Sequence, residues 1–367
     1  MKRFASGCLS CVSHRSGAAW LARAVLGLFA GAAFAQPNTN WTEVNLAVTD
    51  AHVIPAYEAF ARASAGLETD AAAFCMAPDA PAFATLQASF HTAMDGWQGA
   101  QHIQFGPITY FNWNFRIQYW PDDNGTGARQ LNALIAAQDA AALDDEAFDR
   151  QSVGVQGFQA LESLLFDDDS LAQLQGDAYR CQVMHTIAAN IDEIASGVST
   201  RWKDEFRTTV ANADERGFFE SAEDATIDYL KALVEPVRRI QEQKLDAVLG
   251  ETPEAARERR AESWRSQRTL RNIKLNVAAL EHEFTASEPA LSSVLHEADV
   301  GTIAAAFADL RASIDAQPDS LAEALAADGG HAALLQVSAQ LDVLYEAMEA
   351  ALKNTDLYLG FNSLDGD

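Results

Sequence analysis

Two polar side chains, Gln159 and Glu162, lie three residues apart in the otherwise apolar stretch GVQGFQALESLLFD, residues 154–167. Residues at this spacing share one face of an α-helix. A carboxylate and an amide on one face can hold a polar ligand through hydrogen bonds, or offer oxygen atoms to a hard cation. If apolar neighbours bury Glu162, its carboxylate needs a partner. The alternative is an ordinary polar helix face or a local hydrogen bond without a ligand.

The segments around this pair have a helical pattern along almost the whole chain. Apolar residues recur at the spacing of one helix face, whereas the aromatic stretch 105–127 contains Gly and Pro and reads as an ordered connector. No segment shows the alternation of a β-strand. The sequence therefore predicts an all-α fold. The segments with the helical pattern are 44–75, 77–103, 128–138, 146–166, 179–210, 221–250, 265–285, 300–315, 319–327 and 332–353.

A charged, Pro-containing stretch at residues 250–264 separates two groups of these segments. We interpret the chain as two helical-bundle domains, residues 36–250 and 251–367, with a pocket at their junction. Helix bundles place functional side chains on facing helices or where bundles meet.

The first 35 residues differ from the rest of the chain. They contain four basic residues and no acidic residue, then an apolar run from Ala24 to Phe34 and an A-x-A cleavage pattern ending at Ala35. This pattern is typical of a secretory signal peptide. An N-terminal membrane anchor is the alternative, but the run is far shorter than the roughly 20 residues that a span requires. We expect a periplasmic protein without an integral membrane span.

The chain is strongly acidic. Its formal net charge is −26, and removing the four bases of residues 1–35 changes this to −30 for the mature protein. A charge of this sign argues against nucleic acid and anionic membrane surfaces as partners. It is compatible with attraction of cations, but most of it is expected to be solvated surface.

Two cysteines, Cys75 and Cys181, remain after residue 35. In an oxidising compartment an even pair usually forms a disulfide, which here would join the end of the first helical region to a later helix. Two buried thiols are the alternative.

Common catalytic motifs are absent from the sequence, including HExxH, CxxC, a Gly-rich phosphate loop and G-x-S-x-G. No two histidines of the mature chain lie at the helical spacing of metal ligands. His91 and Asp95 are four residues apart, a spacing that more often gives a surface contact than a site. These histidines are His52, His91, His102, His185, His282, His296 and His331.

Several stretches together resemble the imelysin-like proteins, and they occur in a consistent order over nearly the whole mature chain. The family comprises exported bacterial proteins, classed as candidate metallopeptidases and often associated with iron acquisition. The resemblance implies an all-helical fold with two bundle-like domains and a pocket between them. The stretches are FHTAMDGWQGAQHIQFGPI (90–108), RIQYWPDD (116–123), GVQGFQALESLLF (154–166), RTLRNIKLN (268–276) and GFNSLDGD (360–367).

The hallmark of that family is G-x-H-x-x-E on a helix. Here Gly157 and Glu162 match, but Gln159 stands in place of the histidine. An imidazole and a carboxylate would give a divalent metal one nitrogen and one oxygen, whereas glutamine offers a neutral carbonyl oxygen that suits zinc poorly and iron weakly. The resemblance implies Glu162 as a metal ligand, with a divalent metal or iron as the candidate cofactor.

Other residues in the family-like stretches are candidates for ligand binding beside Gln159. Arg116 would pair with Glu162 or Asp122, or bind a ligand carboxylate; a structural salt bridge is the alternative. Trp120 is either part of a ligand site or a packing aromatic. Arg271 and Asn272 would close the pocket from the second bundle, or cap a helix end. The terminal Asn362, Asp365 and Asp367 would dock against the pocket, or fray.

Three functions remain open on this sequence. The first is a non-catalytic protein that binds a metal ion or small ligand as an accessory of iron uptake, with an iron-transport protein as partner. The second is a metallopeptidase of the imelysin type, although the base and ligand arrangement of HExxH is missing. The third is a helical interaction scaffold with a vestigial site.

Overall fold

The structure, a computed structural model, describes residues 39–214, 216–355 and 357. These residues form helices and connecting turns without a β-strand, which confirms the all-α prediction. The predicted signal peptide and the terminal residues Asn362, Asp365 and Asp367 lie outside the described residues.

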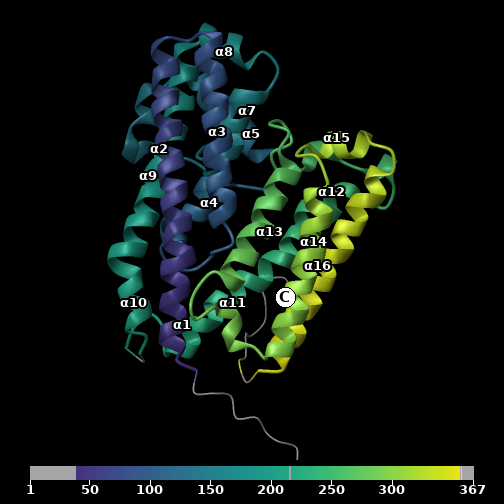
Figure 1. Cartoon of the computed structure of the whole chain (residues 1–367). Helices are drawn as coiled ribbons and strands as arrows, with labels where there is room; N and C mark the ends of the chain where they lie inside the picture. Colours follow the sequence, from purple (N-terminus) through teal and green to yellow (C-terminus); the bar gives the residue numbers. More distant parts are fainter. Residues whose placement is uncertain (1–38, 215, 356, 358–367) are drawn as a thin grey trace, which may run out of the picture. The chain divides into compact units, whose positions relative to one another are not determined.

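The helices follow one another along the chain with few long connections (Figure 1). The α-helices are α1 (Trp41–Val48), α2 (Ile54–Met76), α3 (Ala80–Ala100), α4 (Trp113–Ile117), α5 (Thr126–Ala137), α6 (Asp145–Phe148), α7 (Phe158–Phe166), α8 (Ser170–Gly176), α9 (Ala178–Arg201), α10 (Arg207–Ala211), α11 (Ala222–Arg239), α12 (Ala247–Leu249), α13 (Thr269–Thr285), α14 (Glu297–Asp315), α15 (Leu321–Ala326) and α16 (Gly330–Lys353). The 3₁₀ segments are η2 (Gly106–Asn112), η3 (Ala140–Leu143), η4 (Val153–Val155), η7 (Pro253–Ala255), η8 (Glu258–Arg260) and η9 (Leu291–Val294), and the π-helical segments are η1 (Thr49–Val53), η5 (Trp202–Phe206) and η6 (Ile240–Asp246).

Helix starts follow the capping residues in the sequence. Asp79 accepts a hydrogen bond of 2.8 Å from the backbone N–H of Ala82 at the start of α3, where Pro81 occupies the first turn. Ser221 similarly accepts one of 3.0 Å from the N–H of Asp224 at the start of α11. Each cap satisfies a backbone donor that the first helical turn leaves unpaired.

One predicted helix, residues 146–166, is wrong as a continuous element. The structure divides it into α6, η4 and α7, and α7 begins only at Phe158. The reason is a close backbone approach at Gly157, where an added Cβ would lie 2.1 Å from the carbonyl oxygen of Ile117. The chain is extended at Gly157, which places the start of α7 directly against the end of α4.

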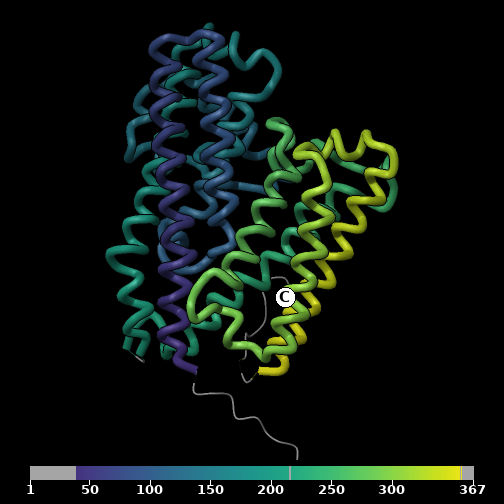
Figure 2. The backbone as a smooth tube through the Cα atoms, viewed as in Figure 1, coloured from purple at the N-terminus to yellow at the C-terminus, as the bar shows by residue number. Residues whose placement is uncertain are grey.

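Two sets of long helices make up the core. In the first set, α2 packs against α3 and α9; in the second, α14 packs against α16 (Figure 1). Helix α13 contacts both α3 and α14, and α11 contacts both α1 and α16, so these two helices join the sets. Figure 2 shows the chain passing continuously from α1 through η1 into α2.

A buried ion pair links these elements through polar contacts. Lys244 of η6 and Glu262 lie 2.9 Å apart, with their side chains 4% and 1% exposed. Lys244 Nζ also donates to Gln98 Oε1 of α3 (3.1 Å) and to Asn276 Oδ1 of α13 (2.8 Å). The described part of Asn40–Asp367 forms one compact unit, and a domain boundary between residues 250 and 251 stays a prediction.

Within the described residues, every helix is too short or too polar to cross a lipid bilayer.

The predicted disulfide is confirmed. Cys75 at the end of α2 is bonded to Cys181 in α9, with the two Cα atoms 5.8 Å apart and 106 residues between them in sequence. The bond therefore ties two core helices that pack side by side.

Reducing this disulfide is expected to lower the free energy of unfolding by about 2–4 kcal/mol, because the unfolded chain regains the entropy of a long open loop. Urea unfolding with and without a reductant measures the loss. The double variant Cys75→Ser/Cys181→Ser should show the lower stability in both conditions. Equal stability of reduced and oxidised wild type would contradict the prediction.

Candidate functional site

A pocket of about 360 Å³ lies between the start of α7 and the irregular segment that precedes α13. Four of the predicted site residues line it: Trp120, Asp122, Gln159 and Glu162. The opposite wall comes from residues on the far side of the predicted domain boundary, namely Arg259, Arg260, Ala261, Ser263, Trp264 and Arg265. Other lining residues are Tyr119, Pro121, Asp123, Gly125, Gly127, Ala128, Leu131, Gly154, Ala160 and Ser163.

Glu162 is buried, with 3% of its surface exposed. One of its carboxylate oxygens, Oε1, accepts hydrogen bonds from the backbone N–H (2.9 Å) and the hydroxyl (2.7 Å) of Ser266. Burial raises the pKa of the Glu162 carboxyl above its ordinary value, while the Ser266 donors and the charge of Arg265 oppose that rise. The partner that a buried Glu162 requires is therefore Ser266, across the pocket.

Gln159 lies one helical turn before Glu162 and lines the same pocket. Its side-chain oxygen Oε1 is shielded from solvent and accepts no hydrogen bond from the described residues. Buried acceptors without a donor are rare in folded proteins because burial removes their hydrogen bonds to water. A ligand with a donor group would supply the missing hydrogen bond.

Asp122 lines the pocket but has a structural task. Its two carboxylate oxygens accept hydrogen bonds of 2.8 Å from the backbone N–H groups of Thr126 and Gly127, at the start of α5. Carboxylates near a helix N-terminus are stabilised by its partial positive charge. Asp122 thereby fixes α5 against the pocket while its side chain forms part of the wall.

The wall formed by residues 259–265 is cationic and aromatic. The guanidinium of Arg265 lies 4.4 Å from the centre of the Trp264 ring, and that of Arg259 lies 5.6 Å from it. Arg265 also donates to Asp167 (2.5 Å), and Arg260 is paired with Asp123. From sequence alone this segment is a charged junction between two groups of helices. Its basic and aromatic run, RERRAESWR, in an otherwise acidic chain is the signal that could have marked it as a site wall.

Arg116 does not line the pocket. It is buried behind α7, where Nε donates to Gln156 (2.6 Å) and the guanidinium contacts Asn190 (2.5 Å) and Asp149. Neither Glu162 nor Asp122 is its partner. Arg116 joins α4 and α9 to the loop that leads into α7. Its contacts are those of a structural salt bridge, the alternative to a role in ligand binding.

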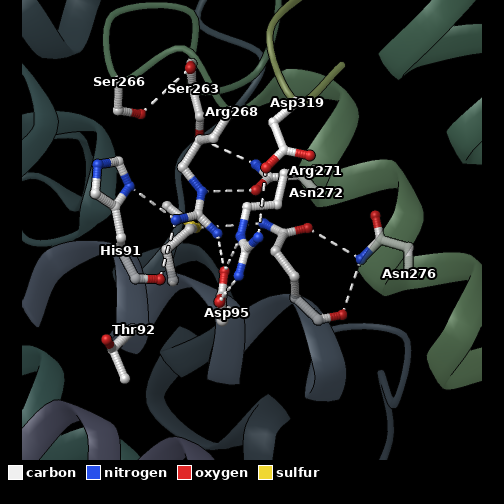
Figure 3. Close-up of polar contacts among 12 residues, drawn as sticks. His91, Thr92, Asp95, Ser263, Ser266, Arg268, Arg271, Asn272, Asn276 and Asp319 are labelled. Carbon is white, nitrogen blue, oxygen red and sulfur yellow. Dashed lines mark hydrogen bonds and ion pairs between the residues drawn. The ribbon is translucent and has the colours of Figure 1, made fainter. Parts of the chain in front are cut away.

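Arg271 and Asn272 belong to a polar network next to the pocket and not to its lining (Figure 3). Arg271 pairs with Asp95 of α3 and with Asp319. Arg268 contacts the same Asp95 and the ring of His91 (3.0 Å). Burial alone would raise the pKa of Asp95, but the two arginines outweigh it and lower the pKa.

Asn272 connects this network to the pocket wall. Its Nδ2 donates to Glu262 Oε2 (2.9 Å) and to the hydroxyl of Ser263 (3.1 Å), and its Oδ1 accepts from Arg268 Nε (2.8 Å). Ser263 lines the pocket, so Asn272 positions the wall from behind (Figure 3).

The side chains around Glu162 do not fit a transition-metal ion. Ser266 already occupies one oxygen of Glu162, Gln159 adds a neutral amide, and Asp122 is engaged by the start of α5. Zinc and iron sites usually combine several imidazole, thiolate or carboxylate ligands, and the residues that line this pocket include no histidine or cysteine. Glu162 as a metal ligand stays a prediction.

Comparison with known proteins agrees with this arrangement of helices. The described residues form an all-helical protein, in which Glu162, five residues after Gly157, lines a pocket. The family model described as Imelysin matches residues 53–348, and the chain belongs to the imelysin family. Among curated proteins, none matches the chain.

Two solved structures share the fold. An imelysin-like protein from Psychrobacter arcticum 273-4 superposes with a TM-score of 0.70 at 21% identity, covering 88% of this chain and 97% of that one. A protein from Parabacteroides distasonis ATCC 8503, described as a candidate iron-regulated protein A precursor, gives a TM-score of 0.67 at 14% identity, covering 87% and 97%.

Gly157→Ala is expected to destabilise the protein by about 1–3 kcal/mol, because the new methyl group would overlap the carbonyl oxygens of Ile117 and Arg116. The matched control is Gly99→Ala in α3, where an added Cβ meets no atom within 4 Å. There, greater helix propensity should stabilise by about 0.5–1 kcal/mol. Urea unfolding compares the two, and similar effects of both changes would refute the close approach.

Glu162→Gln is expected to change stability in a pH-dependent way. The raised pKa means that the folded protein favours the protonated carboxyl. The contribution of the protonated Glu162 carboxyl to the free energy of unfolding is complete below the pKa of glutamate in the unfolded chain, about 4.3. It is lost as pH rises through the pKa of Glu162 in the folded protein. The variant should therefore gain stability relative to wild type as pH rises from about 4 towards neutrality. A difference that stays constant, or falls with pH, in urea titrations would contradict this.

Proposed function

We propose that this chain is an exported, periplasmic protein that binds a small ligand or a chelated metal ion in the α7 pocket, without catalysis, as an accessory of iron uptake. The observation that carries the proposal is the buried Gln159 Oε1, which belongs to a pocket-lining residue and accepts no hydrogen bond from the described part of the chain. Export rests on the signal-peptide pattern of residues 1–35.

The chemistry of the walls supports an oxygen-rich, anionic ligand. Three arginines and Trp264 face the α7 wall, and positive charge beside an aromatic ring suits a planar carboxylate. Since Glu162 and Gln159 supply few ligand atoms, an iron ion would have to enter with most of its coordination provided by a chelator. The link to iron comes from the resemblance to the imelysin-like proteins and from the Parabacteroides relative, described as a candidate iron-regulated protein A precursor.

Metal-dependent peptide hydrolysis has less support. A catalytic zinc site needs about three protein ligands and an open position for water. The lining residues offer one buried carboxylate, half occupied by Ser266, and no imidazole. The pocket therefore suits binding better than hydrolysis.

The test uses calorimetric titration of the mature protein with ferric citrate, with citrate alone and with free Fe²⁺. Ferric citrate should bind wild type, and Gln159→Ala should weaken binding by about tenfold, the effect of about 1.4 kcal/mol for one lost buried hydrogen bond. Gln173→Ala, on the exposed surface of α8, is the matched control and should bind as wild type does.

Elemental analysis after dialysis accompanies the titration, and Glu162→Gln serves as a second pocket variant. The proposal fails if wild type binds neither ferric citrate, citrate nor Fe²⁺, or if both pocket variants bind as tightly as wild type. Tighter binding of citrate alone than of ferric citrate would identify the organic anion, and not the metal, as the ligand.

A further inference from the structure

Three metal-binding side chains that are far apart in sequence meet in the core, away from the α7 pocket. His52 lies in η1, His102 lies two residues after the end of α3, and Glu283 lies in α13. Their side chains are 4%, 3% and 1% exposed. One ligand atom from each lies within 4.8 Å of the others. Among the described residues, this is the one group of three or more His, Cys, Asp or Glu side chains that meets this condition.

Several atoms of this cluster have no hydrogen-bond partner in the described structure. They are both carboxylate oxygens of Glu283 and the Nδ1 atom of His102. Glu283 Oε2 lies 3.4 Å from His102 Nε2, and none of the described Lys or Arg side chains forms an ion pair with Glu283. A fully buried carboxyl without a donor or a cation is costly, so a positive ion is the partner that would stabilise it.

The spacing of the atoms fits one metal ion. His52 Nε2 and His102 Nε2 are 2.8 Å apart, and His102 Nε2 and Glu283 Oε2 are 3.4 Å apart. Two ligands at right angles, each about 2.1 Å from a metal, lie about 3.0 Å from one another. Small movements of these side chains would therefore place all three on one face of an ion.

The ring of His52 is held from its other side. Its Nδ1 lies 2.8 Å from Nδ1 of His282, an exposed residue that precedes Glu283 in α13. A hydrogen bond from His52 Nδ1–H to His282 leaves the lone pair of His52 Nε2 directed towards His102 and Glu283. Metal-binding histidines are usually oriented by such a bond at the second ring nitrogen.

The backbone around His52 also departs from a regular helix. Residues Thr49–Val53 form a π-helical turn between α1 and α2. Single π-helical turns inside α-helices are frequent at functional sites. Here the turn carries His52, whose buried side chain contacts His102.

A small opening connects the cluster to the surface. His102 lines a pocket of about 110 Å³. The other charged residues that line it come from α11, and the acidic Asp228 and Glu235 are balanced by the basic Lys231 and Arg239. The pocket is therefore a route from solvent to His102 and carries no net negative charge of its own.

We propose that His52, His102 and Glu283 form a binding site for a single divalent first-row transition-metal ion. Two imidazoles and one carboxylate are the ligand set that binds Zn²⁺ or non-haem Fe²⁺ and leaves positions open for other ligands. The site would bridge α3, α13 and the α1–α2 helix. It is independent of the α7 pocket and does not rest on the function proposed for that pocket.

The test titrates the metal-free, full mature protein with Co²⁺, whose visible absorption reports nitrogen ligation, followed by displacement with Zn²⁺. One Co²⁺ should bind per chain, and metal should raise the unfolding temperature. Glu283→Gln and His102→Gln should each weaken binding more than about 100-fold. His282→Gln, which removes only the orienting contact, should weaken it about 10–100-fold.

Two controls distinguish this site from others. His185→Gln removes a partly exposed histidine of α9, outside the cluster, and Glu162→Gln removes the carboxylate of the α7 pocket. Both variants should bind Co²⁺ as wild type does. Glu283→Gln removes an unpaired buried carboxyl, so the variant should stay folded, which circular dichroism checks.

Absence of stoichiometric Co²⁺ and Zn²⁺ binding to folded wild type would overturn the proposal. So would binding that survives in Glu283→Gln and His102→Gln but disappears in Glu162→Gln, which would place the metal in the α7 pocket. A failure of ferric citrate to bind that pocket leaves the present test unaffected.

Discussion

The buried ion pair between Lys244 and Glu262 is the interaction on which the arrangement of this protein depends. An isolated charge in the core is prohibitive, so each of the two residues fixes the position of the other. Gln98, Asn272 and Asn276 complete the hydrogen bonds of the pair, and they come from α3 and α13. If either charge were removed, the other would remain buried with only amide groups as hydrogen-bond partners. The pair therefore fixes how α3, η6, α13 and residue 262 are placed relative to one another.

This placement builds the pocket, because the residues that follow Glu262 form its second wall. The segment from Ser263 to Ser266 is held between the ion pair and the Arg268–Asp95 contact, which directs the Ser266 donors towards Glu162. The α7 wall is anchored separately, by the close approach of Gly157 to α4 and by the hydrogen bonds of Arg116 behind it. Each wall is thus held by its own polar contacts, the Lys244–Glu262 pair on one side and the hydrogen bonds of Arg116 on the other. The side chains that face the ligand therefore have little freedom to move. Such preorganisation lowers the entropic cost of binding.

The sequence was informative where local chemistry decides the structure. Helix periodicity, the caps at Asp79 and Ser221, and the pairing of the two mature-chain cysteines were all predictable, because each depends on neighbouring residues or on a two-member set. Trp120, Asp122, Gln159 and Glu162 were found as pocket residues through the resemblance of short stretches to one family. The wall at residues 259–265 could not be found from the sequence, because the segment has no regular periodicity and its position is set by polar contacts with residues far away in the chain. The same applies to His52, His102 and Glu283, which no sequence spacing relates and which come together through the packing of three separate segments.

The two candidate sites differ in ligand chemistry in a way that bears on the glutamine at position 159. The α7 pocket has oxygen acceptors on one wall and guanidinium groups on the other, an arrangement that favours an organic anion over a bare transition-metal ion. Nitrogen ligands are instead gathered at His52 and His102, which are buried beside the carboxyl group of Glu283. An imidazole at position 159 would share the pocket with the positive charge of Arg265. It would also have only one free oxygen of the Glu162 carboxylate beside it, since Ser266 donates to the other. An amide keeps the shape of the helix face, carries no charge and can both donate and accept hydrogen bonds. The substitution therefore fits a pocket that recognises the outer atoms of a ligand, whereas direct metal ligation fits the buried histidine cluster.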